Sequence, residues 1–279
     1  GSTSGSAASV AANLCLAATS TDTGGSTRQP ASFCNLVGLK PTYGRVSRYG
    51  VLAMASSLDA MGHMTKTVYD NALILNTTAD HDEFDATSSR QKVDDYTQDI
   101  GKGVKNVTIG LPREYFDGLD KKIKGLITAA VKKLESLGVR VIDVSLPHTQ
   151  YGVATYYIIQ PSEVSSNLAR YDGIRYGNKR DAFGAEAKRR IILGTFTLSS
   201  GYYDAYYLKA MKVRRLIRDD FVNAFKKVDA LICPVYPTLP FKLGEKVNDP
   251  LTMYLADIDT VNINLAGLPS LAVPCGFID

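Results

Sequence analysis

The sequence predicts a single α/β domain with helices on both faces of a sheet. Two observations lead to this prediction. Short apolar runs alternate with amphipathic segments along the chain, and one strand–helix–strand unit is clear near the middle. The 279 residues suffice to bury a large core, and neither an internal repeat nor a long linker divides them.

The first third of the chain is expected to hold two helices around a polar loop. An alanine-rich apolar run at residues 7–18 predicts a buried helix, and helical spacing predicts another at residues 66–79. Between them, residues 20–30 form a polar loop with paired glycines, and LKPTYG at residues 39–44 is typical of a turn.

The middle of the chain gives the clearest pattern. Residues 107–111 predict a strand, residues 119–137 an amphipathic helix with one apolar face, and residues 139–144 a second strand. Gly138 is expected to end the helix. Two strands joined through such a helix pair in parallel with a right-handed crossover.

The last third is expected to continue the alternation. Residues 201–227 predict a long, basic, tyrosine-rich helix, and residues 229–233 predict a short buried strand that ends at Pro234. A helix at residues 249–258 and a final strand at residues 270–274 complete the predicted domain.

Composition argues against several classes of protein. The net charge is only +4 with scattered basic residues, which favours an ordinary surface over a nucleic-acid interface. A tRNA-binding role for residues 209–218 is disfavoured, because the apolar residues between the basic ones, with Asp219 and Asp220 next in the sequence, are typical of an ordinary amphipathic helix. No run of about 18 apolar residues predicts a membrane span or a membrane partner. Four cysteines without CxxC spacing favour buried free thiols in a reducing compartment.

Several types of catalytic site are also excluded. The chain lacks the GxxxxGK[ST] phosphate loop and the HExxH zinc motif, and its three histidines are isolated. The nearest match to a GxSxG elbow, GGSTR at residues 24–28, lacks the last glycine. His63, His81 and His148 lie in polar contexts and are expected at the surface or at caps. A nucleophilic serine would therefore need another base, such as a buried lysine.

Two serine–glycine loops flank the alanine-rich run: GSTSGS at residues 1–6 and DTGGS at residues 22–26. Glycine lets the backbone approach a substrate and aim successive N–H groups in one direction, which can hold a developing oxyanion. The first loop alone is also typical of a flexible linker. The second combines an aspartate, a serine and an arginine before Pro30, a composition that favours a site.

Three segments together resemble the amidase-signature family: GSTSGSAA at residues 1–8, DTGGSTRQPA at residues 22–31 and FCNLVGLKPTYGRVSRYG at residues 33–50. The resemblance implies an α/β/α fold with a mixed, mostly parallel sheet and helices on both faces. It also implies amide hydrolysis by a Ser–cis-Ser–Lys triad.

The resemblance assigns roles to five residues of the two loops. Ser26 would be the nucleophile, and Ser2 the bridging serine beside a cis peptide bond. The backbone amides of Thr23, Gly24 and Gly25, with that of Ser26 itself, would form the oxyanion hole. A cis bond that does not precede proline costs about 3–4 kcal/mol, so it would be retained only for function.

The family's catalytic lysine lies upstream of the first serine–glycine loop. We therefore expect residues 1–279 to be one incomplete amidase-signature domain that lacks its C-terminal end and its N-terminal part with the lysine. Lys40 is expected to support a turn and not to replace that lysine.

Within the family, later segments resemble the glutaminase components of tRNA-dependent amidotransferases, known as their A subunits, among them residues 165–177, 188–196, 198–207 and 264–269. This resemblance implies that the chain hydrolyses glutamine and supplies ammonia for the conversion of Glu-tRNA(Gln) to Gln-tRNA(Gln). A stand-alone amidase of another small amide and a catalytically silent assembly subunit remain the alternatives.

A glutamine pocket must pair a free carboxylate and a free ammonium, which calls for an arginine and an acidic residue near the nucleophile. The resemblance implies Arg190 for the carboxylate, Asp257 for the ammonium and Tyr156 for a hydroxyl contact. Asp259 and Tyr157 remain alternatives to Asp257 and Tyr156.

The same resemblance implies the partners: an amidotransferase B subunit, together with a small C-like or F-like subunit, with tRNA reached through the complex. It implies no metal or organic cofactor for this chain, because ATP and Mg²⁺ would serve the partner. Residues 178–187 form a shorter stretch than we expect of bacterial members. This favours a form from the mitochondrial matrix over one from the bacterial cytoplasm.

Overall fold

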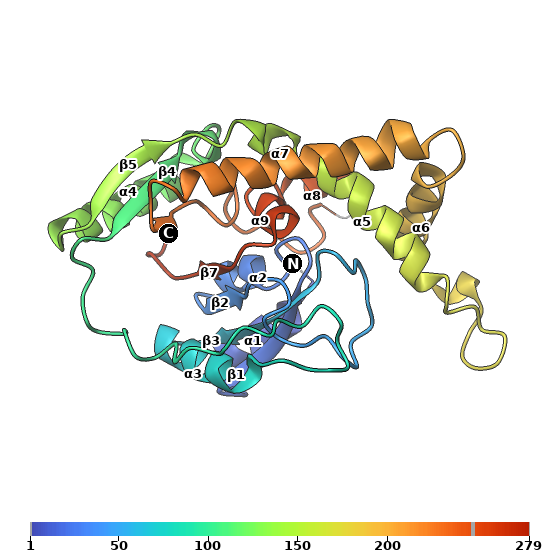
Figure 1. Cartoon of the computed structure of the whole chain (residues 1–279), viewed down its shortest axis with the longest axis horizontal. Coiled ribbons are helices and arrows are strands. Elements are labelled where there is room, and N and C mark those ends of the chain that lie inside the picture. Colours follow the sequence, from blue (N-terminus) through green and yellow to red (C-terminus); the bar gives the residue numbers. More distant parts are fainter. Residues whose placement is uncertain (1, 247–248, 279) are drawn as a thin grey trace.

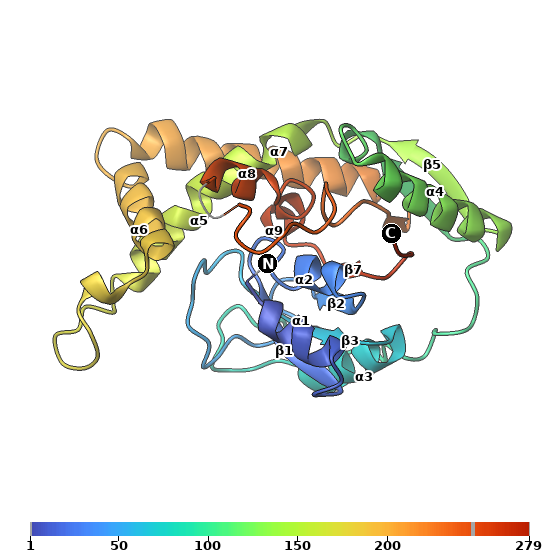
Figure 2. The same cartoon turned by 180° about the vertical axis from the view of Figure 1, so that it is seen from behind.

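The computed structural model describes residues 2–246 and 249–278. It confirms the predicted α/β class: two sheets and a layer of long helices pack together (Figure 1), and the view from behind shows the same arrangement (Figure 2). One sheet lies with α1, α2 and α3 and the other with α4; α7 extends from beside the second sheet across the molecule toward α5 and α6 (Figure 1).

The first sheet has the strand order β1–β3–β2–β7, and each neighbouring pair is antiparallel. Its strands are β1 (Ala17–Asp22), β2 (Val37–Lys40), β3 (Ala60–Thr65) and β7 (Ser270–Ala272). Because β1 and β2 are both antiparallel to β3, they run in the same direction, and β3 is inserted between them. The expected majority of parallel pairs is therefore not seen in this sheet.

Helices cover both faces of this sheet, as predicted. They are α1 (Ser4–Ala11), α2 (Arg28–Phe33) and α3 (Val68–Thr78). Successive residues of a strand point to opposite faces. Accordingly, Met64 of β3 packs with α1 and α2 in a core cluster of Ala7, Val10, Ala31 and Leu36. His63, the preceding residue, contacts α3 on the other face.

The predicted helix at residues 7–18 is wrong in its second half. The helix α1 ends at Ala11, and Asn13 adopts a left-handed backbone with φ 61°, which breaks the helix. From Ala17 the chain forms β1, whose residues pair with β3 from Ala17 against Thr65 to Asp22 against Ala60. Six ladder pairs with β3 therefore outweigh the helix propensity of the alanines.

The second sheet confirms the central prediction. Strands β4 (Thr108–Pro112) and β5 (Arg140–Val144) are parallel and joined through α4 (Lys121–Ser136); β6 (Ala230–Leu231) pairs in parallel on the other side of β4. Asp120 caps α4 by accepting bonds from the amides of Lys122 and Ile123. Gly138, with φ 95°, follows the helix end as expected.

The second half of the chain contains α5 (Gly152–Leu168), α6 (Ala185–Thr197), α7 (Lys209–Ala224) and the shorter α8 (Pro250–Leu255) and α9 (Val261–Ala266). Helices α5, α7 and α9 supply most of the largest core cluster of the described residues. In Figure 1, α7 extends along one edge of the molecule. It packs on α5 and α9 through buried residues that include Ile159, Ile217, Phe221 and Val261.

The remaining elements are short. They are three short 3₁₀ helices, η1 (Arg113–Tyr115), η2 (Pro147–Tyr151) and η3 (Arg180–Ala182), and the π-helix η4 (Tyr203–Leu208), which leads directly into α7. The predicted helix at residues 201–227 is therefore η4 followed by α7. The predicted helices at residues 66–79 and 249–258 correspond to α3 and α8, and the predicted strands at residues 229–233 and 270–274 to β6 and β7.

Candidate active site

The turn that carries Ser26 joins β1 to α2. Residues 22–25 and 27–30 are buried, whereas Ser26 is only half-buried. Its side chain lines a cavity of about 640 Å³, which also receives residues from α5, α6 and the segment around α8. A hydroxyl on a buried backbone turn is thus presented to a cavity large enough for an amino acid.

The carboxylate of Asp22, the last residue of β1, holds this turn. It accepts bonds from the amides of Gly25 (2.9 Å) and Thr27 (3.3 Å), from Arg28 Nε (2.9 Å) and from Asn264 Nδ2 (2.9 Å). Burial alone would raise the pKa of Asp22, but the Arg28 guanidinium and the other donors hold this pKa at about 2. Asp22 is therefore ionised beneath the turn.

A second buried carboxylate braces the start of the turn. Asp59 accepts a bond from Thr23 Oγ1 at 2.6 Å and from the amides of Met54 and Ala55. Burial raises the pKa of Asp59, against these donors. The two carboxylates, Asp22 and Asp59, thus fix both ends of the segment from Thr23 to Ser26.

The expected oxyanion donors are only partly available. The Gly25 amide donates to Asp22, so the prediction that it faces the substrate is wrong. The Asp22 carboxylate lies only three residues before Gly25 and accepts from its amide. Gly25 has a φ of 135°, a backbone conformation that residues with a side chain rarely adopt. Within the described residues, no acceptor binds the amides of Thr23, Gly24 or Ser26. These three amides remain candidates for holding an oxyanion.

Close packing explains both glycines of the turn. A Cβ on Gly24 would lie 2.5 Å from the hydroxyl of Tyr156, and one on Gly25 would lie 2.5 Å from Thr260 Oγ1. The hydroxyl of Tyr156 therefore sits directly against the turn, at the cavity where the resemblance placed it. Burial raises the pKa of Tyr156, so its phenol is neutral and able to donate a hydrogen bond.

Ser2 lines the same cavity as Ser26. It also lines a second cavity of about 660 Å³, bounded by Thr21, Thr23 and Asp59, so it lies where the two cavities adjoin. The neighbouring Thr3 donates its hydroxyl to Thr21 O at 3.3 Å, which ties this end of the chain to β1. The peptide bond between Ser2 and Thr3 is trans, which contradicts a cis bond after Ser2. The bond before Ser2 joins it to Gly1, which lies outside the described residues.

No histidine is among the described residues that line either cavity. His63 is 2% exposed, so its expected place at the surface is wrong. It lies in β3 with Nε2 3.1 Å from Thr78 Oγ1, and burial lowers the pKa of His63 to about 4. Its side chain faces α3 and not the turn of Ser26, which agrees with a site that has no histidine base.

Charged residues of both signs line the first cavity, among them Glu186, Arg189 and Lys246. Arg190 from α6 and Asp257 from the segment after α8 both line it. Asp259 does not; it is buried elsewhere, and burial raises its pKa to about 7. The structure thus favours Asp257 over Asp259 as the acidic residue of the pocket.

Arg190 is held by its neighbours in a way that leaves part of the guanidinium open. Its Nε donates to Glu186 Oε1 at 2.8 Å, and its Cζ lies 5.7 Å from the ring of Tyr157 and 5.9 Å from that of Tyr254. Burial lowers the pKa of Arg190, but the bond to Glu186 and the nearby tyrosines raise it on balance. The side chain stays cationic, and its two Nη groups have no acceptor among the described residues.

Asp257 accepts bonds from one buried and one partly buried side chain, Gln29 and Tyr157. Gln29 Nε2 lies 2.8 Å from Oδ1, and the hydroxyl of Tyr157 lies 2.7 Å from Oδ2. Burial raises the pKa of Asp257, and these two donors oppose that rise. Tyr157 therefore supports Asp257, whereas Tyr156 faces the turn, so each tyrosine contributes to a different end of the cavity.

Lys40 is buried at the end of β2, away from Ser2. Its Nζ donates to the carbonyls of Leu268 (2.7 Å) and Pro41 (3.1 Å), as expected for a residue that supports a turn. Burial lowers the pKa of Lys40 to about 7. Lys40 is absent from the residues that line the two cavities beside Ser2, so it does not act as their base.

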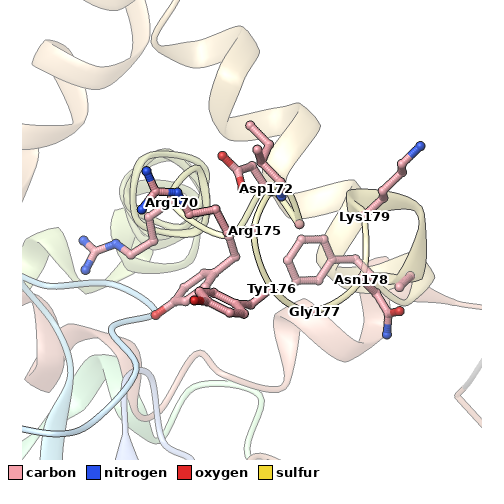
Figure 3. A pocket seen from close by; sticks show the side chains of 12 residues that line it. Arg170, Asp172, Arg175, Tyr176, Gly177, Asn178 and Lys179 are labelled. Atoms are coloured by element: carbon pink, nitrogen blue, oxygen red, sulfur yellow. Dashed lines mark hydrogen bonds between the residues drawn. The ribbon is translucent and has the colours of Figure 1, made fainter.

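A third hollow of about 770 Å³ lies over the connection between α5 and α6 (Figure 3). Asn178 and Lys179 lie across it from Arg170. None of Ser26, Arg190 and Asp257 lines it, so this hollow is separate from the candidate chemistry.

Three further observations concern metal ions, the membrane and the cysteines. The described residues contain no group of three or more side chains suited to a metal ion. No helix in the described part of the chain is long and apolar enough to cross a membrane. The four cysteines are free thiols, but Cys275 is exposed, which contradicts its predicted burial.

The sequence pointed to Arg190 and Asp257 only through the family resemblance. It gave no indication of Gln29, Glu186 or Thr260, which also contribute contacts to the site.

The fold therefore presents a half-buried serine, Ser26, on a glycine turn at the wall of a cavity that no histidine of the described residues lines. The Amidase family model matches residues 1–279, and the chain belongs to this family.

Individual relatives narrow the comparison. The A subunit of glutamyl-tRNA(Gln) amidotransferase from Thermodesulfovibrio yellowstonii is 55% identical over 292 residues, and its counterpart from Myxococcus xanthus is 57% identical over 293. Each match covers 99% of this chain, and the chain spans 60% of each relative. Both alignments are longer than the chain, so these relatives carry additional residues.

Solved structures give the same picture. The crystal structure of the glutamyl-tRNA(Gln) amidotransferase A subunit from Thermotoga maritima superposes with a TM-score of 0.85 at 48% identity, over 99% of this chain and 58% of that one. A bacterial aryl acylamidase of the amidase-signature family gives a TM-score of 0.80 at 27% identity, over 100% and 59%. The named sequence relatives are bacterial, which does not support the mitochondrial assignment.

Proposed function

We propose that the full-length protein is the glutamine-hydrolysing A subunit of a glutamyl-tRNA(Gln) amidotransferase. The identity of 55–57% to proteins of that name, over 99% of this chain, supports the proposal. The observation on which it mainly rests is that Ser26, Arg190 and Asp257 line one cavity of about 640 Å³. Glutamine carries the three groups that these side chains suit: a neutral amide, a carboxylate and an ammonium.

In the proposed complex, the open Nη groups of Arg190 bind the α-carboxylate of glutamine, and Asp257 binds the α-ammonium. The side chain of glutamine then extends toward the turn, where Tyr156 donates a hydrogen bond to the substrate. This binding mode places the side-chain amide at Ser26, because the charged groups anchor only the opposite end of the molecule.

The proposed reaction begins with attack of Ser26 Oγ on the amide carbon. Its proton passes to Ser2, which gives its own proton to a lysine that the family resemblance places upstream of residue 1. The amides of Thr23, Gly24 and Ser26 hold the oxyanion. Collapse with return of the proton to nitrogen releases ammonia and leaves a glutamyl ester on Ser26. Water then attacks the ester and releases glutamate.

The remaining parts of the function follow from the proposal. The ammonia is passed to a B subunit that uses ATP and Mg²⁺ to activate Glu-tRNA(Gln), and a small C-like or F-like subunit completes the complex. The chain itself is proposed to work without a metal or organic cofactor. Because the named relatives are bacterial, we propose the bacterial cytoplasm as the compartment.

A stand-alone amidase of an aromatic amide is the second candidate. The rings of Tyr157 and Tyr254 stack at 4.0 Å in the cavity wall, where Tyr236 and Phe241 also lie, and one structural relative is an aryl acylamidase. Such a substrate would leave the Nη groups of Arg190 and the carboxylate of Asp257 without a charged ligand, which is why glutamine is the better match.

Glutamate release by the full-length protein with its partner subunits tests the proposal. Ser26→Ala should lower the rate at least about 1000-fold, because the nucleophile is lost. Ser136→Ala, in an exposed position of α4, is the matched control and should change nothing. Arg190→Met should raise KM for glutamine about tenfold or more. Wild-type protein that hydrolyses aryl amides but not glutamine would instead establish the second candidate, and full activity of Ser26→Ala would exclude Ser26.

A further inference from the structure

Gln29 lies between the two ends of the candidate site. It is on the first turn of α2, three residues after Ser26, and is 4% exposed. Its amide nitrogen is 2.8 Å from Asp257 Oδ1 and 3.2 Å from Thr260 Oγ1. The two hydrogens of this amide therefore have two acceptors, one at each end of the site.

The contact with Thr260 continues to the nucleophile turn. Thr260 Oγ1 donates its single hydrogen to the carbonyl of Gly24 at 2.6 Å, so it must act as the acceptor for Gln29. This carbonyl belongs to the peptide plane that joins Gly24 to Gly25. Fixing that plane sets the direction of the neighbouring amides, which are those proposed to hold the oxyanion.

Close packing leaves Gln29 little freedom. A Cβ placed on Gly25 would lie 3.0 Å from Gln29 Nε2, so the amide rests against the turn itself. On its other side, the Asp257 carboxylate has Tyr157 as its second side-chain donor. A shift of Asp257 toward a bound ammonium would therefore act on Gln29, and through Thr260 on the turn.

We propose that Gln29 is a positioning residue that couples recognition of the substrate ammonium at Asp257 to the geometry of the oxyanion turn. This inference rests on the proposed function, since it requires an α-amino amide as substrate. It predicts that the site prefers substrates with an α-ammonium over those without one mainly through Gln29 and Asp257. It also predicts that the branch to Thr260 acts on the chemical step of every substrate.

The test compares glutamine with glutaramic acid, which is glutamine without its α-amino group. The readout is the ratio of their kcat/KM values, measured as ammonia release by the full-length protein in its complex. In Gln29→Met this ratio should fall about 10- to 100-fold, the effect of losing a hydrogen bond to a charged group. Gln150→Met, at an exposed position of η2, is the matched control and should keep the wild-type ratio.

Two further variants separate positioning from folding. Thr260→Val should lower kcat for both substrates about equally and keep the ratio, because it removes only the branch to the turn. Gln29→Asn keeps the amide but shortens the side chain by one methylene, so it should lose the bond to Asp257 and lower the ratio as Gln29→Met does.

The outcomes are distinct. An unchanged ratio in folded Gln29→Met, or in folded Gln29→Asn, overturns the role of Gln29 while glutamine hydrolysis stands. A Thr260→Val variant that loses discrimination as strongly as Gln29→Met overturns the division into two branches. Failure of the wild-type complex to hydrolyse glutamine rejects the proposed function, and this inference with it.

Discussion

Replacement of Asp22 by asparagine tests whether a buried ion pair holds the nucleophile turn. Asp22 and Arg28 are 0% and 1% exposed, and Arg28 Nε lies 2.9 Å from the carboxylate. Arg28 also donates to Thr260 O and to Asn264 Oδ1, so it cannot leave the core without breaking these contacts. Removing one charge of such a pair leaves the other uncompensated, and we expect a loss of about 3–5 kcal/mol at pH 7.

The pH dependence gives a second, independent magnitude. The pKa of Asp22 is about 2 in the folded protein against an ordinary value of 3.8, and this difference corresponds to about 2 kcal/mol. Because the folded pKa is the lower one, this stabilisation is complete above pH 4 and is lost as the pH falls through 2. The stability difference between wild type and Asp22→Asn should therefore shrink by about 2 kcal/mol between pH 4 and pH 2.

Urea unfolding followed by far-UV circular dichroism at pH 7, 4 and 2 measures both quantities. The matched control is Asp143→Asn, because Asp143 pairs with Arg113 at 3.8 Å with both side chains mostly exposed. That variant should cost about 0–1 kcal/mol. A loss below about 1 kcal/mol for Asp22→Asn, or a difference that stays constant from pH 4 to pH 2, would refute the reasoning.

Two other predictions concern the turn and its support. Gly24→Ala puts a methyl group 2.5 Å from the Tyr156 hydroxyl and 2.6 Å from its ring carbon Cζ, and should lower glutamine hydrolysis about 100-fold; the effect should be smaller in a Tyr156→Ala background, which removes the ring, and equal effects in both would contradict the clash. Burial lowers the pKa of Lys40 from 10.5 to about 7, so unfolding stability of wild type relative to Lys40→Met should rise as pH goes from 7 to 10. If the difference in unfolding free energy between the two proteins stays constant from pH 7 to pH 10, burial does not lower the pKa of Lys40.

The part of the fold that the sequence predicted well is the part with the strongest local patterns. The unit from β4 through α4 to β5 has an apolar helix face, a capping aspartate and a glycine at the helix end, and each of these acts within a few residues. Local patterns of this kind need no knowledge of the rest of the chain. The helix α3, with Thr67 accepting a bond from the Asp70 amide, is a similar case.

Elements that depend on distant partners were missed or misjudged. The strand β1 combines two threonines, which favour strands, with two alanines and an aspartate, which do not, and pairing with β3, some 40 residues later, stabilises it. The helix α2 is just six residues long, starts without a side-chain cap and contains Pro30. Neither segment has enough local signal to predict its structure, because tertiary contacts decide it.

The candidate site shows the same division. Ser26 and Ser2 stood in short motifs that the sequence displays directly, and the structure brings both to one cavity. Thr260 lies in no motif, and Gln29 lies within the segment at residues 22–31 without a role assigned to it, because the contact between them joins residues more than 230 positions apart. Gly25 was assigned to the oxyanion hole with its neighbours, since a sequence does not show which of several adjacent amides an aspartate will bind.

The segment from Asp257 to Asn264 also supports the nucleophile turn. Arg28 binds the carbonyl of Thr260 and the side chain of Asn264, and Asn264 in turn donates to the carboxylate and the carbonyl of Asp22. The residue proposed to recognise the ammonium and the residues that fix the turn thus belong to one short stretch of chain. A small displacement of that stretch moves binding and chemistry together, which gives the Gln29 contact its functional meaning.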